Sequence, residues 1–247
     1  SKEKIEERVK SVSDTLRLSS FLNLPARKLT ADQKQLISLG RGLVREDVAG
    51  VLMDEPLTVI DPDLKFRLRR NLKEINEQYK TTLVYVTHDQ NEAMTFADNI
   101  IVMDQGEIVQ VGLPKDLFER PKTTFVGYFI GSPAMNIFES KVSSDYSVKI
   151  NNIEIKTSSN LSKVKDKNVK LGIRSEFINV AEKEGQNTIK ALLTRVEDFG
   201  NFKLLTANMG DFVIKSKVNR EMPISNGDIN LYIPPEKCCV YINEKLI

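Results

Sequence analysis

Two carboxylates stand side by side at the end of an apolar segment, in VLMDEPLTVIDPDLK at residues 51–65. If the apolar run is a strand of an open parallel sheet, Asp54 and Glu55 lie at its carboxyl end, where such sheets bind ligands. An aspartate there can hold Mg²⁺ through a water, because Mg²⁺ keeps much of its hydration shell. The adjacent carboxylate can activate a water for in-line attack on a phosphate. The alternative is a solvated turn or an acidic helix N-terminus.

The one histidine of the chain follows a second apolar segment, in VTHDQ. If the two strands are parallel neighbours, His88 and Glu55 emerge on the same edge of the sheet. An imidazole there can donate a hydrogen bond to a phosphate oxygen. In the alternative interpretation, His88 and Asp89 only cap the following helix. Polar chemistry at two matching strand ends favours a functional site.

The elements that would carry these residues alternate between helix and strand. Apolar residues at spacings of three and four predict helices over 2–18, 31–45 and 64–75. Short apolar runs predict buried strands at 48–54, 81–87 and 99–104, with a short helix between the last two. Strands alternating with helices predict an α/β fold with a mostly parallel sheet, covered on both faces.

A different pattern occupies the C-terminal half. Gln105 and Gly106 are typical of a hairpin turn between two strands, and helical patterns follow at about 114–130. Residues 138–247 then contain short alternating runs separated by Asn, Gly and Ser, which predict a small antiparallel barrel or sandwich. We therefore expect two domains, 1–133 and 134–247.

Composition excludes several function classes. The net charge is +2, and basic residues alternate with acidic ones instead of forming a stripe, so a nucleic-acid partner is not expected. No apolar run reaches the 18–20 residues or so that a spanning helix needs, and the charged first ten residues do not resemble a secretory signal. The adjacent Cys238 and Cys239 have neither disulfide-framework nor metal-site spacing, so a structural role is expected.

The motifs together resemble a known family. Residues 29–112 resemble the second half of the ATPase subunit of ABC transporters: VLMDEP is similar to the Walker B strand, LTVID to the D-loop and YVTHDQNEA to the switch-histidine segment. ADNIIVMDQGEIVQVGLPKDLFERP resembles the strand, hairpin and helix that close that domain. FVGYFIGSPAMN, LGIRSEF and VEDFG are similar to the carbohydrate-import branch, which adds a C-terminal OB-like domain. DEPLTVIDPDLK looks like the glycerol and glycerol-3-phosphate importers of that branch.

The resemblance implies residue roles. Asp54 would be the ligand of a Mg²⁺-bound water, Glu55 the general base in ATP hydrolysis, and His88 the switch that contacts the γ-phosphate. Asp61, in the D-loop position, would help couple two ATPase halves across their interface. The implied cofactors are ATP and Mg²⁺.

The signature loop departs from the family pattern. LSGGQ in the family corresponds to LTADQ here, which comprises Leu29, Thr30, Ala31, Asp32 and Gln33. Such a loop presents backbone N–H groups and a hydroxyl to a partner's nucleotide at the start of a helix. The hydroxyl and the glutamine amide are kept, but Ala31 and Asp32 replace both glycines, which removes backbone freedom and adds a negative charge. The alternative is an ordinary helix cap.

A phosphate loop of the form GxxxxGK[ST] is not found, because none of the 12 glycines precedes a lysine. In the resembled family this loop and the glutamine lid precede the segment matched here. The chain is therefore interpreted as the C-terminal part of a longer or split subunit, and alone it is not expected to hydrolyse ATP.

The functional hypothesis is the ATPase subunit of an importer for a carbohydrate or a polyol such as glycerol or glycerol-3-phosphate. Its fold would be a partial P-loop NTPase domain followed by an all-β OB-like barrel. Its implied partners are a second ATPase subunit (the same or different), two membrane permeases and, indirectly, a periplasmic solute-binding protein, at the cytoplasmic face of the bacterial inner membrane. The alternatives are a degenerate, non-catalytic partner or regulatory binding module, and an ABC ATPase acting on DNA or in translation.

Overall fold

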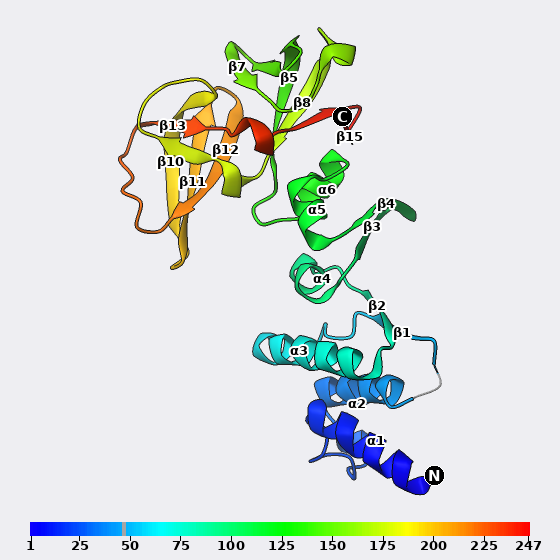
Figure 1. Cartoon of the computed structure of the whole chain (residues 1–247). Coiled ribbons are helices and arrows are strands. Elements are labelled where there is room, and N and C mark those ends of the chain that lie inside the picture. Colours follow the sequence, from blue (N-terminus) through cyan, green and yellow to red (C-terminus); the bar gives the residue numbers. More distant parts are fainter. Residues whose placement is uncertain (46–47) are drawn as a thin grey trace. The chain divides into compact units, whose positions relative to one another are not determined.

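The computed structural model describes residues 1–45 and 48–247 (Figure 1). The chain forms two compact units, Ser1–Asp98 and Asn99–Ile247, each described by itself below. Within the described residues, no helix has the length and apolar content that crossing a membrane requires.

The first unit consists of helices and one pair of parallel strands. Its elements are α1 (Lys2–Thr15), η1 (Ala26–Lys28), α2 (Ala31–Leu43), β1 (Gly50–Asp54), α3 (Pro62–Tyr79), β2 (Thr82–Val86) and α4 (Gln90–Phe96). The helical stripes predicted from sequence face a common core, in which Leu16, Leu57 and Leu72 are completely buried. The Ser1 side chain caps α1 by accepting a hydrogen bond from the Lys4 N–H.

Strands β1 and β2 pair in parallel, and their ends coincide. Gly50 lies opposite Thr82 and Asp54 opposite Val86, so the segments that follow both strands leave the same edge. The prediction that the two strands are buried is wrong: Leu52 is 81% exposed, and Val84 and Val86 are also exposed. The apolar run correctly indicates a strand, but within β1 and β2 only Met53 is buried.

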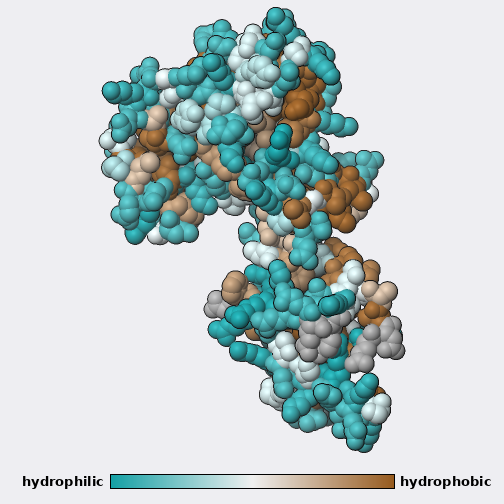
Figure 2. Space-filling model, in the orientation of Figure 1, coloured by the Kyte–Doolittle hydropathy of each residue, from teal (hydrophilic) through white to brown (hydrophobic). Residues whose placement is uncertain are grey.

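The second unit begins with a hairpin and two short helices. Strands β3 (Ile100–Asp104) and β4 (Glu107–Gly112) are antiparallel. Positive φ angles at Gln105 and Gly106 give the tight turn predicted from sequence. The hairpin exposes apolar side chains, including Ile101, Met103 and Ile108, which contribute to the brown surface in Figure 2.

The helical patterns predicted at 114–130 correspond to two short helices. They are α5 (Pro114–Glu119) and α6 (Thr124–Phe129). Pro121 lies between them, and a proline both lacks the N–H of a helical hydrogen bond and disfavours helix at the residue before it. The side chain of Thr123 then caps α6 by accepting from the Val126 N–H.

The rest of the second unit is two antiparallel sheets. The sheet strands are β5 (Asn136–Ser144), β6 (Ser147–Ile150), β7 (Ile153–Lys156), β8 (Asn168–Ile173), β9 (Asn179–Ala181), β10 (Thr188–Asp198), β11 (Phe202–Met209), β12 (Phe212–Asn219), β13 (Asp228–Tyr232), β14 (Cys239–Ile242) and β15 (Lys245–Leu246), with 3₁₀ turns η2 (Ser162–Val164), η3 (Ser175–Phe177) and η4 (Pro235–Lys237). Their orders are β12-β11-β10-β13-β9 and β15-β14-β8-β5-β6-β7. One core of alternating apolar residues joins both sheets, as the sequence predicts for an all-β domain.

The predicted domain boundary and the division into compact units fall at different places. The units divide at Asp98 and Asn99, whereas the sequence places a boundary after residue 133. Backbone hydrogen bonds run from Thr124 N–H to Glu244 C=O and from Leu246 N–H to Lys122 C=O, so α6 and the segment before it pack with the last strands. The division at 133 stays a prediction.

Candidate functional site

Glu55 follows β1 directly, in a backbone conformation that few side-chain-bearing residues adopt. Its φ is +46°, in the left-handed region. Three contacts hold it there: its N–H donates to Val86 C=O at 2.9 Å, and its C=O accepts from Thr58 N–H at 3.3 Å and from the Gln35 side chain at 2.9 Å. Strained residues of this kind are concentrated at functional sites, where the surrounding structure over-determines them.

The carboxylate of Glu55 meets His88 from the end of β2. Nδ1 of His88 lies 2.5 Å from Glu55 Oε1, and the His88 backbone N–H donates to the same oxygen at 3.1 Å. The Thr58 hydroxyl donates to the other oxygen, Oε2, at 2.8 Å. The sequence expectation that Glu55 and His88 emerge on the same edge of the sheet and converge is therefore confirmed.

The contact favours the charged form of both groups. The hydrogen bond from His88 lowers the pKa of Glu55 below its ordinary value, with a smaller contribution from Thr58. The hydrogen bond to Glu55, reinforced by its charge, raises the pKa of His88. The side chain of His88 is 77% exposed and that of Glu55 is 35% exposed, so a ligand can reach the pair.

The two aspartates singled out from sequence lie on either side of Glu55 along the chain. Asp54 is the last residue of β1 and is exposed. Asp61 directly precedes α3, and its C=O accepts from the Lys65 N–H in the first turn of that helix. No group of three or more His, Cys, Asp or Glu residues suited to a metal ion occurs in the described parts of the chain. One exposed carboxylate fits Mg²⁺ that keeps several waters and is bound mainly by phosphate, not an all-protein metal site.

The LTADQ segment forms the start of α2. Thr30 is the N-cap, and its N–H donates to the Gln33 side-chain oxygen at 3.1 Å. The Thr30 hydroxyl donates to the carboxylate of Asp32, and this hydrogen bond lowers the pKa of Asp32. Thr30 and Gln33, whose side chains the sequence suggests as contacts to a partner's nucleotide, therefore both make hydrogen bonds within the segment. The structure therefore shows the helix cap, which sequence analysis gave as the alternative, in detail.

Two neighbouring polar residues were missed by the sequence analysis. Gln35, whose side chain donates to the Glu55 carbonyl, lies one turn into α2, outside the LTADQ segment. Glu92, only 3% exposed, lies in the first turn of α4. The only sequence feature that could have drawn attention to Glu92 is its position four residues after His88. Its partners come from α3, from β2 and from the residue that follows β2, and no local pattern indicates them.

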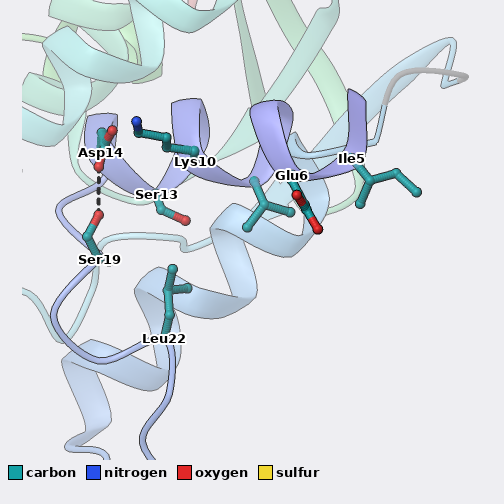
Figure 3. Close-up of a pocket in the computed structure, with 8 residues that line it drawn as sticks. Ile5, Glu6, Lys10, Ser13, Asp14, Ser19 and Leu22 are labelled. Carbon is teal, nitrogen blue, oxygen red and sulfur yellow. Dashed lines mark hydrogen bonds between the residues drawn. The ribbon is translucent and has the colours of Figure 1, made fainter. Parts of the chain in front are cut away.

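A surface pocket of the first unit lies elsewhere. It has a volume of about 400 Å³ and lies along α1 and the segment after it (Figure 3), and is lined by Ile5, Glu6, Val9, Lys10, Ser13, Asp14, Ser19 and Leu22. The Ser19 hydroxyl donates to Asp14 at 2.7 Å across one end. None of the residues predicted to carry chemistry lines this pocket.

Comparison with known proteins places this site in a family context. The chain is 35% identical over 237 residues to the oligosaccharides import ATP-binding protein MsmX of Bacillus subtilis, covering 92% of this chain and 64% of MsmX. It is 36% identical over 240 residues to the sn-glycerol-3-phosphate import ATP-binding protein UgpC of Yersinia enterocolitica, covering 95% of this chain and 66% of UgpC. It is 34% identical over 237 residues to the trehalose/maltose import ATP-binding protein MalK of Thermococcus litoralis, covering 92% of this chain and 63% of that MalK. The chain is homologous to importer ATP-binding subunits.

A family model agrees for the second unit. The MalK OB fold domain matches residues 131–178, which include β5 through β8. Among solved structures, an ATP-binding cassette of an ABC transporter in its ADP conformation aligns with a TM-score of 0.41 at 23% identity, covering 47% of each chain. With parallel strands in the first unit and antiparallel sheets in the second, the predicted α/β class with a C-terminal OB-like barrel is confirmed.

The chain spans about two thirds of the length of these homologues. The homologues are ATP-binding subunits by name.

Proposed function

We propose that this chain supplies the water-activating and phosphate-sensing part of an ATP-hydrolysing subunit that drives a solute importer. The observation that supports this most directly is the convergence of Glu55 and His88 at neighbouring strand ends, 2.5 Å apart and open to solvent. A functional pair must be reachable by substrate and held in place by its surroundings, and the contacts of Thr58, Val86 and Gln35 meet the second condition.

The geometry supports a division of labour between the two side chains. In the described structure the Glu55 carboxylate accepts hydrogen bonds from His88 and Thr58, which hold it in its ionised form. An ionised carboxylate at a strand end can orient a water and accept its proton. The neighbouring imidazole, whose charged form the same contact favours, can donate a hydrogen bond to a phosphate oxygen. Asp54 would hold the hydrated Mg²⁺ that neutralises phosphate charge.

The phosphate-binding loop itself must come from outside these 247 residues. No glycine here precedes a lysine, and about a third of the length of each homologue lies outside the region that this chain matches. ATP would then be held between that loop and the LTADQ segment of a second ATPase subunit. Two membrane permeases, a periplasmic solute-binding protein acting through them, and a place at the cytoplasmic face of the inner membrane complete the proposed assembly.

The proposed solute is a carbohydrate or a polyol such as glycerol or glycerol-3-phosphate. Support comes from the homologues, which are named as ATP-binding proteins for the import of oligosaccharides, sn-glycerol-3-phosphate and trehalose or maltose. The OB-fold match at 131–178 supports the same branch. Growth on each solute, with the gene deleted and restored, measures which one depends on the subunit.

The test of the catalytic proposal uses the subunit assembled with its phosphate loop. Glu55→Gln should retain ATP binding and lose at least about 100-fold in hydrolysis rate, an effect of the size expected for a general base. Glu74→Gln is the matched control, because Glu74 is an exposed carboxylate of the same unit whose only described ion pair is with Arg70. Hydrolysis that does not depend on Glu55 would refute the proposal.

One observation favours a second candidate function, a non-catalytic partner in a heteromeric ATPase pair. The hydrogen bond between Thr30 and Asp32 occupies the hydroxyl that the signature loop would offer, and Asp32 adds a negative charge facing a polyphosphate. In this hypothesis the chain pairs with a different ATPase whose loop is intact. Purification of a fully active homodimer would contradict it.

A further inference from the structure

Glu92 is a nearly buried carboxylate whose partners come from two elements other than its own helix. Its Oε2 accepts from the Tyr85 hydroxyl at 2.8 Å and from the Thr87 hydroxyl at 3.1 Å. Its Oε1 lies 3.5 Å from Lys65 Nζ and 3.7 Å from Arg69 Nη1, both on α3. A carboxylate that is only 3% exposed requires such compensation, because an isolated buried charge is strongly unfavourable.

These contacts fix the backbone on both sides of His88. The Thr87 hydroxyl that donates to Glu92 also accepts from the Asp89 N–H at 3.0 Å. Asp89 in turn caps α4 by accepting from Asn91 N–H and Glu92 N–H. The residues before and after His88 are therefore both tied to the helix that carries Glu92, and the His88 N–H and ring are directed at Glu55.

The same carboxylate connects this turn to α3. Lys65 and Arg69 are one turn apart, in the first half of the helix that Asp61 directly precedes. A displacement of the start of α3 would therefore pull on Glu92, and through Thr87 on the peptide that holds His88.

We propose that Glu92 is a positioning residue that couples α3, and with it the Asp61 segment, to the placement of His88 against Glu55. The inference rests on the proposed function, since the placement of His88 matters for activity only if the pair acts on nucleotide. The structural part of the inference can be tested separately. Removing the contacts of Lys65 and Arg69 with Glu92 should displace His88 from Glu55 even in the protein without nucleotide.

The test reads His88 directly. The chain contains one histidine, so its ring resonance in an NMR titration is unambiguous. The groups that face the ring are Glu55 after β1, Asp89 in the turn and Glu92 on α4. Glu55→Gln sets the reference, because it removes the contact that raises the His88 pKa.

The decisive variant is Lys65→Met with Arg69→Met, because the two explanations predict opposite signs. Removing two cations from the surroundings of His88 would, through space alone, raise its pKa. Loss of positioning would lower it toward the value in Glu55→Gln, and would speed exchange of the His88 amide proton, which donates to Glu55. Arg70→Met is the matched control, since it removes a cation from the same helix at an exposed position that pairs with Glu74 and not with Glu92. No change is expected there.

A neutral variant covers the possibility that the charge substitutions unfold the unit. Thr87→Val removes the hydroxyl that links Glu92 to the turn and leaves the net charge unchanged, so a fall in the His88 pKa is expected. Thr87→Ser restores the hydroxyl and should restore the pKa. An unchanged or raised His88 pKa in folded Lys65→Met/Arg69→Met, or an unchanged pKa in Thr87→Val, would overturn the coupling. Failure of the proposed function would instead appear as ATP hydrolysis that is independent of Glu55.

Discussion

One oxygen of Glu55 receives both the backbone N–H and the ring nitrogen of His88, a residue 33 positions away, at 3.1 and 2.5 Å. Its other oxygen is satisfied by the Thr58 hydroxyl. The pair therefore links the ends of β1 and β2 by side-chain contacts as well as by strand hydrogen bonds.

The stabilisation that the Glu55–His88 pair gives to the folded state should weaken both at high pH, through His88, and at low pH, through Glu55. The raised His88 pKa gives a contribution that is complete below its ordinary value of 6.5 and lost as pH rises through the folded-state pKa. The lowered Glu55 pKa gives a contribution present above 4.5 and lost as pH falls through the folded-state pKa. We expect the coupling free energy, from urea unfolding of Glu55→Gln, His88→Gln and the double variant, to be larger between those values than at a pH well above the folded-state pKa of His88. Equal coupling at both would contradict the ion pair.

The hydrogen bond between Thr30 and Asp32 gives a prediction for the assembled ATPase. Asp32→Gly should free the Thr30 hydroxyl and remove a negative charge from the start of α2, so nucleotide-dependent association of the two ATPase subunits should strengthen about tenfold, as expected for one charge-assisted hydrogen bond. Asp32→Asn separates the two effects, because its amide oxygen can still accept from Thr30. Association can be measured by sedimentation with a slowly hydrolysed nucleotide. Unchanged association in Asp32→Gly would show that the loop does not contact nucleotide.

Core packing in the first unit can be tested with two leucines of opposite exposure. Leu72 on α3 is completely buried, whereas Leu52 on β1 is 81% exposed. Leu72→Ala should lower the free energy of unfolding by about 2–5 kcal/mol, because it removes buried methyl groups and leaves a cavity. Leu52→Ala should change it by less than about 0.5 kcal/mol. Urea unfolding of both variants provides the comparison, and a similar cost at both positions would mean that Leu52 is covered in solution.

A guanidinium joins the helices and sheets of the second unit. Arg174, only 1% exposed, donates to the carbonyl groups of Phe118, Gly127 and Ile130 and stacks on the Phe118 ring at 4.7 Å. Burial lowers its pKa from the ordinary value. Arg174→Met should cost about 2–4 kcal/mol, because it leaves buried carbonyl groups without donors. Arg220→Met, which breaks an exposed pair with Asp198, should cost under about 1 kcal/mol. Thermal unfolding of the two variants tests the difference.

The adjacent cysteines should be unreactive in the folded protein. Burial raises the pKa of Cys238 to about 12 and also raises that of Cys239. Since the thiolate is the reactive form, both should react with a disulfide reagent at least about 100-fold more slowly in the native chain than in urea at about pH 8. Rapid labelling of either in native buffer would contradict their burial.

Sequence patterns predicted much of this fold because the decisive signals are local. The stripes of the first unit, the turn at Gln105 and Gly106, and the alternating runs after residue 138 each specify their own element. The meeting of Glu55 and His88 was also predictable, because parallel neighbours end at one edge. Pro121, visible in the sequence, explains the division of α5 from α6 within the range where helical patterns were predicted.

Non-local contacts account for what the sequence did not predict. The Glu92 cluster depends on side chains from α3 and β2, and no spacing within α4 reveals them. The exposure of Leu52 likewise depends on which elements cover the strand. An apolar run indicates only that a strand favours burial, not that another element covers it. Capture of the Thr30 hydroxyl by Asp32 depends on rotamers at the start of α2, which composition does not determine.

The carbonyl contacts of Arg174 have a practical consequence for dissecting the protein. A fragment cut at residue 134 would discard Phe118, Gly127 and Ile130, stranding a buried cation and stripping the Tyr241 hydroxyl of its acceptor on Pro121. A fragment of the C-terminal portion should therefore begin before β3, near Asn99, so that it keeps the hairpin and both short helices together with the two sheets.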